Sequence, residues 1–197
     1  MSLAALTFNE AAHVYRHAGQ VVPSVTQILA PLANFEGIPA DVLERKRRLG
    51  QAVHLACQFD DEGDLDEASI TDDVRGYLEA YRRFRRETGA RVVANERRVY
   101  HATLGYAGTL DRVLEIRARH WLTDLKTCIA TPLAVGPQTA AYELAGGFDP
   151  AFPRIHYRAA LRLAPDGRYQ LDTLTSAHDW PAFLACLTLR NFREAHQ

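Results

Sequence analysis

Apolar residues recur at helical spacing in some segments of the chain and at strand spacing in others. Between Thr71, a suitable N-terminal cap, and Gly89, a suitable end, the apolar side chains repeat with a period near 3.6 and predict an amphipathic helix. Ser24 and Gln27 have capping-box spacing and predict the start of a short helix. Further helices are predicted over residues 38–57, 137–145 and 180–195.

Other segments have the apolar, β-branched character of strands. Three consecutive strands are predicted over residues 91–100, 106–116 and 120–127, and a hairpin over 155–163 and 169–175. Residues 8–22 predict a small hairpin, and the acidic stretch from Asp60 to Asp73 predicts a loop. This order of elements indicates one α/β domain over residues 1–197, with a mixed central β-sheet flanked by helices.

Composition narrows the class of protein. The chain has 197 residues, a formal net charge of −1 and no apolar run near the roughly 18 residues of a membrane helix. Its first residues lack the basic and apolar regions of a secretory signal, so we expect a cytoplasmic protein without membrane contact. Three widely spaced cysteines argue against a cysteine-ligated zinc or iron–sulfur site.

Basic residues are clustered rather than spread evenly. Arginine supplies 21 of the 23 basic residues, and they gather at 45–48, 82–86 and 97–98. Such patches suit a partner that carries phosphates on one face. The alternative is a set of solvated helix faces with internal ion pairs, and charge alone favours that alternative.

Two acidic residues lie inside runs that otherwise resemble buried strands. Asp111 and Asp124 would be costly to ionise there unless a partner offsets their charge. Lys126 shares a strand face with Asp124, because residues i and i+2 point the same way. Two carboxylates and an amine fit a Mg²⁺ site with a catalytic cation beside it, and a cross-strand salt bridge is the plainer alternative.

The register of the two strands decides whether these acids meet. If the turn is centred between Arg117 and Ala118, the position numbers of opposed residues add up to 235, which places Asp111 opposite Asp124. Arg-Ala is a poor two-residue type I′ turn, so a longer, symmetric loop with the same register is expected.

The motifs around these residues occur in a characteristic order. Asp111 follows Gly108 by three positions, Asp124-Leu125-Lys126-Thr127 comes next, and Gln138 and Tyr142 are spaced four apart; Gly50-Gln51-Ala52-Val53-His54 and the segment 22–29 precede them. Over roughly residues 8–145 this set resembles the PD-(D/E)xK nuclease superfamily, most closely its RecB-like and phage-type exonuclease branch. The resemblance implies a restriction-endonuclease-like core.

The resemblance also implies roles for individual residues. Asp111 and Asp124 would be the metal-binding acids, Lys126 the catalytic lysine, and the Leu125 carbonyl and His54 further metal ligands. A histidine ligand admits Mn²⁺ as well as Mg²⁺. For His54, the alternative is an ordinary histidine whose hydrogen bonds are satisfied within the fold.

Four further residues are candidates for support or for DNA contact. Gln138 and Tyr142 resemble a Gln-x-x-x-Tyr motif beside the active site, with Pro137 marking a helix start suited to a phosphate. Glu96 is a candidate support for the metal or phosphate site, and Arg48, six residues before His54, a candidate phosphate contact. Packing alone for Gln138 and Tyr142, and plain surface exposure for Arg48, are the alternatives.

These observations favour a metal-dependent DNA nuclease, specifically a phage-type exonuclease serving recombination or repair. The alternatives are a structure-specific or single-strand endonuclease and a non-catalytic DNA-binding protein with the same fold. A small-substrate phosphohydrolase is disfavoured by the arginine clusters. DNA is the expected partner; a single-strand annealing or recombination protein and self-association are left open. The chain lacks the cysteines of iron–sulfur members of the branch.

Overall fold

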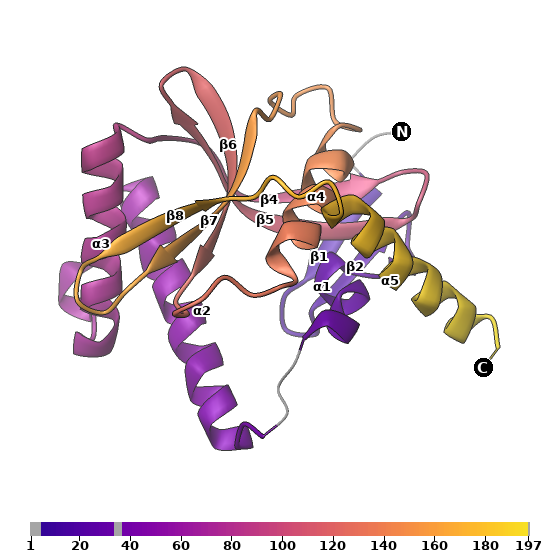
Figure 1. Ribbon diagram of the computed structural model, residues 1–197, viewed down its shortest axis with the longest axis horizontal. Helices are drawn as coiled ribbons and strands as arrows, with labels where there is room; N and C mark the ends of the chain where they lie inside the picture. The colour runs from indigo at the N-terminus through magenta and orange to yellow at the C-terminus, as the bar shows by residue number, and fades with distance from the viewer. Residues whose placement is uncertain (1–4, 34–36, 197) are drawn as a thin grey trace.

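The computed structural model describes residues 5–33 and 37–196, and a five-stranded mixed sheet forms its centre (Figure 1). The strand order is β4-β5-β6-β7-β8, and every neighbouring pair is antiparallel except the parallel pair β6 and β7. The bounds are β4 Arg91–His101, β5 Tyr106–Ile116, β6 Arg119–Lys126, β7 Tyr157–Leu163 and β8 Tyr169–Thr173. Helix α4, Val135–Gly146, connects the parallel pair, as such a crossover requires.

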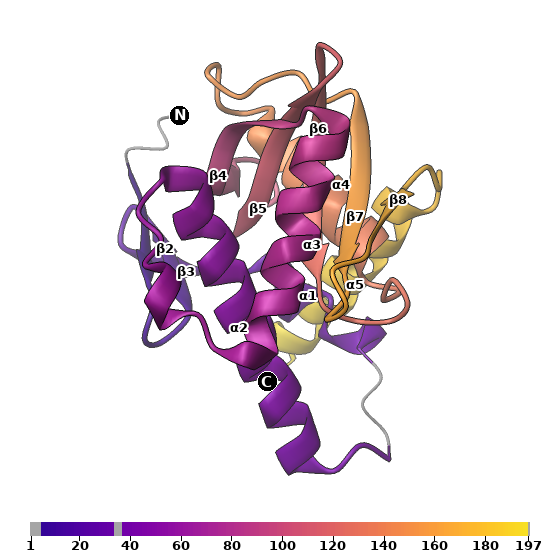
Figure 2. The ribbon, with the colours of Figure 1, turned by 90° about the vertical axis from the view of Figure 1, so that its left-hand side faces the viewer.

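Helices cover both faces of this sheet. Helices α2 (Ala40–Glu62) and α3 (Asp72–Thr88) lie side by side over one face (Figure 2), where they bury an apolar cluster with Leu114, Leu125 and Leu161. Helices α1 (Val25–Ile28), α4 and α5 (Asp179–Glu194) pack on a second cluster that includes Val113 and Leu122. The expected α/β class, with a mixed central sheet flanked by helices, is confirmed.

The N-terminal segment is more elaborate than the expected hairpin. It forms a three-stranded antiparallel sheet of β1 (Leu6–Asn9), β2 (Val14–His17) and β3 (Gln20–Val22). The capping box at the start of α1 is present, because the Ser24 hydroxyl accepts from the Gln27 amide and the Gln27 side chain accepts from the Ser24 amide. Short 3-10 helices cover Ala30–Leu32 and Glu67–Ser69.

Two predicted helix boundaries are wrong. Helix α2 continues past residue 57 to Glu62 and ends at Gly63, whose left-handed φ of 76° closes it. The first residues of the acidic stretch are therefore helical, and ion pairs with arginines of α3 compensate their charge. Helix α4 starts at Val135, so Pro137 lies inside its first turn, where a missing amide hydrogen breaks no helical hydrogen bond.

The turn between β5 and β6 departs from the expectation in length but not in register. Paired residues from Arg112–Thr123 to Ile116–Arg119 have position numbers that add up to 235, as predicted. The connection is only Arg117-Ala118, with φ of 51° and 59°, so the longer loop is wrong. A type I′ turn matches the right-handed twist of the strands, and the chain accepts its left-handed backbone without glycine.

Within residues 5–33 and 37–196, no helix combines the length and apolar character that crossing a membrane would require. Cys57, Cys128 and Cys186 are all free thiols.

Candidate metal centre

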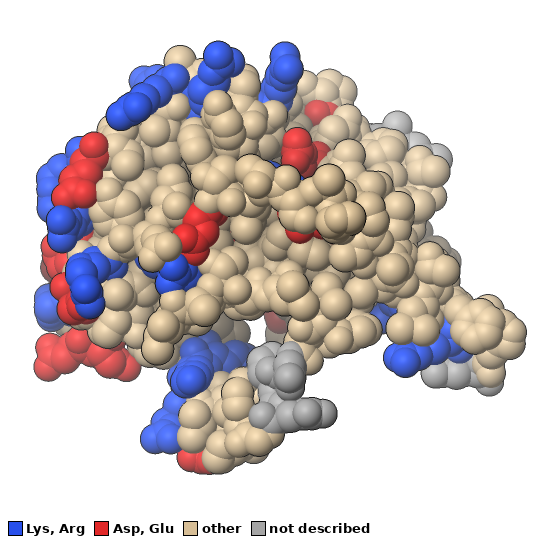
Figure 3. Space-filling model, in the orientation of Figure 1, with Lys and Arg blue, Asp and Glu red and all other residues tan. Residues whose placement is uncertain are grey.

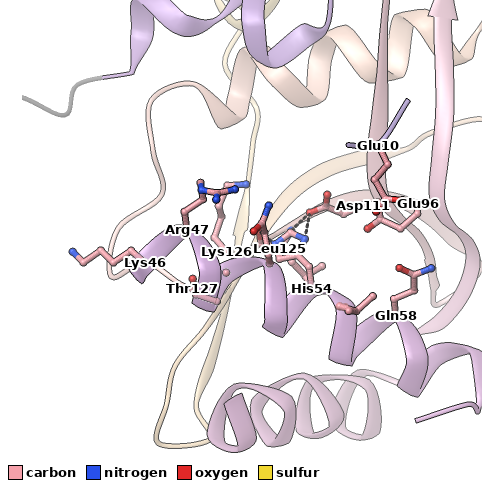
Figure 4. A pocket seen from close by; sticks show the side chains of 13 residues that line it. Glu10, Lys46, Arg47, His54, Gln58, Glu96, Asp111, Leu125, Lys126 and Thr127 are labelled. Atoms are coloured by element: carbon pink, nitrogen blue, oxygen red, sulfur yellow. Dashed lines mark hydrogen bonds and ion pairs between the residues drawn. The ribbon is translucent and has the colours of Figure 1, made fainter. Parts of the chain in front are cut away.

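A cavity of about 640 Å³ lies between α2 and the sheet, beside the middle of β4 and β5, which carry Glu96 and Asp111, and the end of β6. Figure 4 shows its acidic side chains Glu10, Glu96 and Asp111 together at one end, and Lys46, Arg47 and Lys126 toward the other. The remaining lining residues come from α2 and the end of β6: Gly50, Gln51, His54, Leu55, Gln58, Leu125 and Thr127.

The sheet opens where these acids lie. Asn95 pairs with Arg112 and Arg97 with Leu110, so Glu96 lies opposite Asp111 without forming a ladder pair. Glu96 has a left-handed φ of 45°, a conformation that costs a non-glycine residue about 1–3 kcal/mol. Unpaired, strained backbone of this kind is concentrated at functional sites, and here it presents both carboxylates to one cavity.

Three side chains from three elements converge in this opening. One ligand atom each from His54 of α2, Glu96 of β4 and Asp111 of β5 lie within 4.8 Å of one another. All three side chains are half-buried, so each is held by the fold yet reachable from the cavity. An imidazole and two carboxylates offer nitrogen and oxygen donors suited to a divalent cation.

The hydrogen bonds of His54 favour such a cation. Its Nε2 lies 2.9 Å from the carbonyl oxygen of Leu125, which can only accept, so Nε2 carries the hydrogen. Burial lowers the pKa of His54, partly against the Asp111 charge, and this favours the neutral ring. The lone pair of Nδ1 then faces Asp111 Oδ2 at 3.6 Å, two acceptors with no hydrogen between them.

Asp124 lies beside this cluster rather than within it. The β5–β6 pairing ends at Arg112–Thr123, and Asp111 Oδ2 accepts the Leu125 amide hydrogen at 2.7 Å instead. Asp124 is 2% exposed; its Oδ1 accepts from the Gln138 side chain at 3.0 Å, and its Oδ2 lies 2.5 Å from the Lys126 ammonium. Asp124 Oδ2 is therefore paired with an ammonium that compensates its charge.

The pKa values report crowded negative charge. Burial, with a contribution from Asp111, raises the pKa of Glu96 to about 7. Burial and the Asp111 charge also raise the pKa of Asp124, to about 6, although Lys126 opposes them. Burial lowers the pKa of Lys126, but the charges of Asp124 and Asp111 outweigh it and the pKa rises. Only one amine lies among three carboxylates.

The donor set therefore fits a divalent metal ion. His54 Nδ1 and Asp111 Oδ2 face each other without a hydrogen, and Glu96 is held beside them. A cation would satisfy these acceptors and remove the electrostatic cost that raises the two carboxyl pKa values. Neither Mg²⁺ nor Mn²⁺ is singled out by these residues.

Gln138 and Tyr142 reach the site from the opposite face of the sheet. Gln138 supports Asp124, and its amide also lies 3.4 Å from the Tyr142 hydroxyl. Tyr142 is 3% exposed, and its ring packs so close to Gly108 that a Cβ there would lie 2.4 Å from it. Neither residue lines the cavity, so in this structure both support Asp124 from behind.

Arg48 lies on the exposed side of α2 and does not line the cavity. Its Nε pairs with Glu44 at 2.7 Å, and Arg47 shares the same carboxylate. The neighbouring Lys46 and Arg47 do line the cavity, as do Gln51 and Gln58. Arg47, Gln51 and Gln58 lie seven, three and four residues from His54, and this helical spacing was the signal that could have identified them.

The second arginine cluster is structural in its contacts. Arg82 pairs with Asp60, Glu67 and Glu79, and Arg85 with Asp60 and Asp61. The acidic stretch and these arginines thus join α2 to α3. For this cluster the internal ion pairs favoured by charge alone are what the structure shows.

Comparison with known proteins supplies no argument about this chain. No family model matches the chain, and no curated protein matches it. Among solved structures, the chain is similar to the crystal structure of an alkaline exonuclease from Laribacter hongkongensis, with 16% sequence identity and a TM-score of 0.35. The similarity covers 88% of this chain and 92% of that one.

Proposed function

We propose that this protein is a divalent-metal-dependent nuclease that hydrolyses phosphodiester bonds in DNA. The observation that carries the proposal is the convergence of His54, Glu96 and Asp111 in one cavity with the ammonium-bearing side chain of Lys126. Acidic ligands for a metal and a fixed cation beside them are the groups that phosphoryl hydrolysis requires. The opened sheet around Glu96 and Asp111 supports a site maintained for chemistry rather than for stability.

Metal binding is assigned to Asp111, Glu96 and His54, which converge in the cavity. Asp124 and the Leu125 carbonyl, the other two predicted ligands, lie beside this cluster, where the Leu125 carbonyl accepts from His54 Nε2. Bound Mg²⁺ or Mn²⁺ would supply Lewis-acid chemistry, lowering the pKa of water and polarising a phosphate. Asp124 Oδ2 is paired with Lys126, while Gln138 holds its other oxygen in place.

Lys126 acts as a charged donor. Its pKa is raised by Asp124 and Asp111, so its ammonium stays protonated at neutral pH and can stabilise charge on a phosphate oxygen. A lysine acting as a general base would need the opposite shift. The side chain is 24% exposed, which leaves its ammonium accessible from the cavity it lines.

The surroundings of the site favour a polymeric, phosphate-rich substrate. Basic residues 45–48 lie on the amino-terminal half of α2, which projects from the body of the molecule, and Figure 3 shows Lys and Arg side chains gathered there. Lys46 and Arg47 extend this basic surface into the cavity. Within the nuclease class we propose a phage-type exonuclease acting in recombination or repair, with an annealing or recombination protein as partner.

One experiment tests both class and subclass. The purified protein is incubated with end-labelled linear DNA and with closed circular DNA, in Mg²⁺, in Mn²⁺ and in EDTA. An exonuclease degrades only the linear DNA and only with metal. Nicking of circles would identify an endonuclease, and inertness would favour a DNA-binding protein. Protein with Lys126→Ala, purified in parallel, controls for contaminating nuclease.

A further inference from the structure

A second, larger cavity of about 910 Å³ adjoins the metal centre. The two cavities share Lys46 and Thr127 as lining residues, so they meet where α2 passes the end of β6. One wall is α2 and α3, and the other is the β7–β8 hairpin with the segment after β6. In Figure 3 the surface is hollowed between the projecting half of α2 and the body. The second cavity therefore lies next to the first, on the side of Lys46 and Thr127.

The lining of the second cavity combines apolar and aromatic groups. Leu49, Tyr77 and Tyr169 come from three different elements, and Ile129, two residues after Thr127, is 95% exposed. An isolated exposed isoleucine is unremarkable, but here it borders the same cavity as Tyr169, while Tyr77 is 8% exposed and belongs to the apolar core. Aromatic and apolar surfaces of this kind stack on nucleobases whatever the base, since each base has a π-face.

The charge of the second cavity suits a phosphate backbone. Its ionisable lining residues are Lys46, Arg162 and Arg168 against the single carboxylate of Asp166, apart from the Cys128 thiol and the tyrosines. Arg168 is 77% exposed and pairs only with Asp166, its near neighbour in the turn. Lys46 forms no ion pair within residues 5–33 and 37–196. Arg162 is paired with Asp172, so the cations left to an anionic ligand are Lys46 and the exposed guanidinium of Arg168.

We infer that this second cavity holds the nucleotides of a single DNA strand that adjoin the scissile phosphate. The inference rests on the proposed nuclease function and names its substrate as single-stranded, either a free strand or a separated end. Lys46 and Arg168 contact phosphates, and bases lie against Ile129 and Tyr169. A single strand exposes its bases to these side chains, whereas a duplex keeps its bases paired and stacked inside. Binding is tolerant of sequence.

Binding in EDTA tests this without requiring cleavage. The affinity of a fluorescein-labelled 12-nucleotide single strand is measured by anisotropy for the wild type and for Ile129→Ser combined with Arg168→Gln. The variant is expected to bind about tenfold more weakly, which corresponds to about 1.4 kcal/mol. The matched control is Leu133→Ser with Arg154→Gln, which removes an exposed apolar residue and a charge outside the cavity lining.

The native thiols provide a second readout. Cys128 lines the second cavity and is half-buried, whereas Cys57 is 0% and Cys186 7% exposed, so alkylation reports on this cavity. Saturating single strand should slow alkylation of Cys128 in the wild type. Three results would each overturn the inference. They are unchanged labelling of Cys128, equal affinities of the Ile129→Ser, Arg168→Gln variant and its control, and a duplex that competes as well as the single strand. Active protein with these results would leave the nuclease proposal standing.

Discussion

Helix α2 contacts strand β5 at two places, one where opposite charges are paired and one where negative charge is not compensated. Asp61 and His54 are seven residues apart on this helix, and their partners Arg112 and Asp111 are neighbours in β5. Asp61 Oδ2 accepts from Arg112 Nε at 2.7 Å, with Arg85 and the Tyr81 hydroxyl on the same carboxylate. At His54, by contrast, the acceptor atom Nδ1 faces Asp111 Oδ2, which is also an acceptor.

The contrast separates a structural pair from a candidate active site. Asp61 and Arg112 are 1% and 0% exposed, and the guanidinium also lies 5.1 Å from the Tyr81 ring, so the two charges compensate each other within the fold even though the Arg112 Nη atoms make no hydrogen bond. Glu96 and Asp124 are held with raised pKa values, which means the fold tolerates an electrostatic cost there. Folding alone gains nothing from that arrangement, whereas binding a cation does.

The largest effect is expected from breaking the compensated pair. Asp61→Asn leaves the buried Arg112 charge without its counterion and should lower the free energy of unfolding by about 3–5 kcal/mol. Chemical denaturation measures this, with the exposed Asp64→Asn as control, expected to change stability by less than about 0.5 kcal/mol. A loss below about 1 kcal/mol would show that the pair is not the electrostatic anchor of α2.

Substitutions at the candidate metal centre should lower the rate of cleavage rather than the stability. Asp111→Asn, Asp124→Asn and Lys126→Ala are each expected to lower metal-dependent cleavage at least about a hundredfold, or roughly 2.7 kcal/mol of transition-state stabilisation. Glu96→Gln should act in the same direction. Initial rates on linear DNA measure the effect, and circular dichroism verifies the fold. Near-normal turnover in any variant removes that residue from the mechanism.

The raised pKa values give the metal-free protein a characteristic pH dependence. Glu96 titrates near 4.5 unfolded and near 7 folded, and Asp124 near 3.8 and near 6, so folding favours their protonated forms. Their contribution to stability is full below about pH 4 and is lost as the pH rises through about 6–7.

We therefore expect Glu96→Gln to have a higher melting temperature than the wild type at pH 7.5 in EDTA. The gain in the free energy of unfolding should be on the order of 1 kcal/mol at pH 7.5 and smaller at pH 5. Mg²⁺ or Mn²⁺ should raise the melting temperature of the wild type more than that of the variant. Thermal unfolding at several pH values measures both. A difference between the two proteins that does not vary with pH would contradict the assigned shift.

The smallest effect concerns the exposed arginines. Arg47→Gln with Arg48→Gln should reduce the slope of log affinity against log salt for DNA by about 1–2. Arg83→Gln with Arg86→Gln removes the same charge from α3 and should leave the slope nearly unchanged. Equal slopes in the two double variants would show that Arg47 and Arg48 are ordinary solvated surface residues that do not contact DNA.

The fold class and the order of elements could be predicted from sequence because they depend on local periodicity. The helix between Thr71 and Gly89 and the register of β5 with β6 follow from side-chain spacing and from the position of the turn. Asp111, Asp124 and Lys126 could be identified because carboxylates in buried strands are costly. Their roles stay predictions.

What only the tertiary structure decided is which charges compensate each other. Sequence spacing could not show that Arg112 and Arg82 neutralise the acidic residues of α2, or that Asp124 is held by Gln138 and Lys126 while Glu96 joins His54 and Asp111. Pairing across the sheet depends on strand order, on the broken ladder at Glu96 and on the depth of each side chain. The energy of a charge is set by its distance to other charges and by its access to water, and both are properties of the packed molecule.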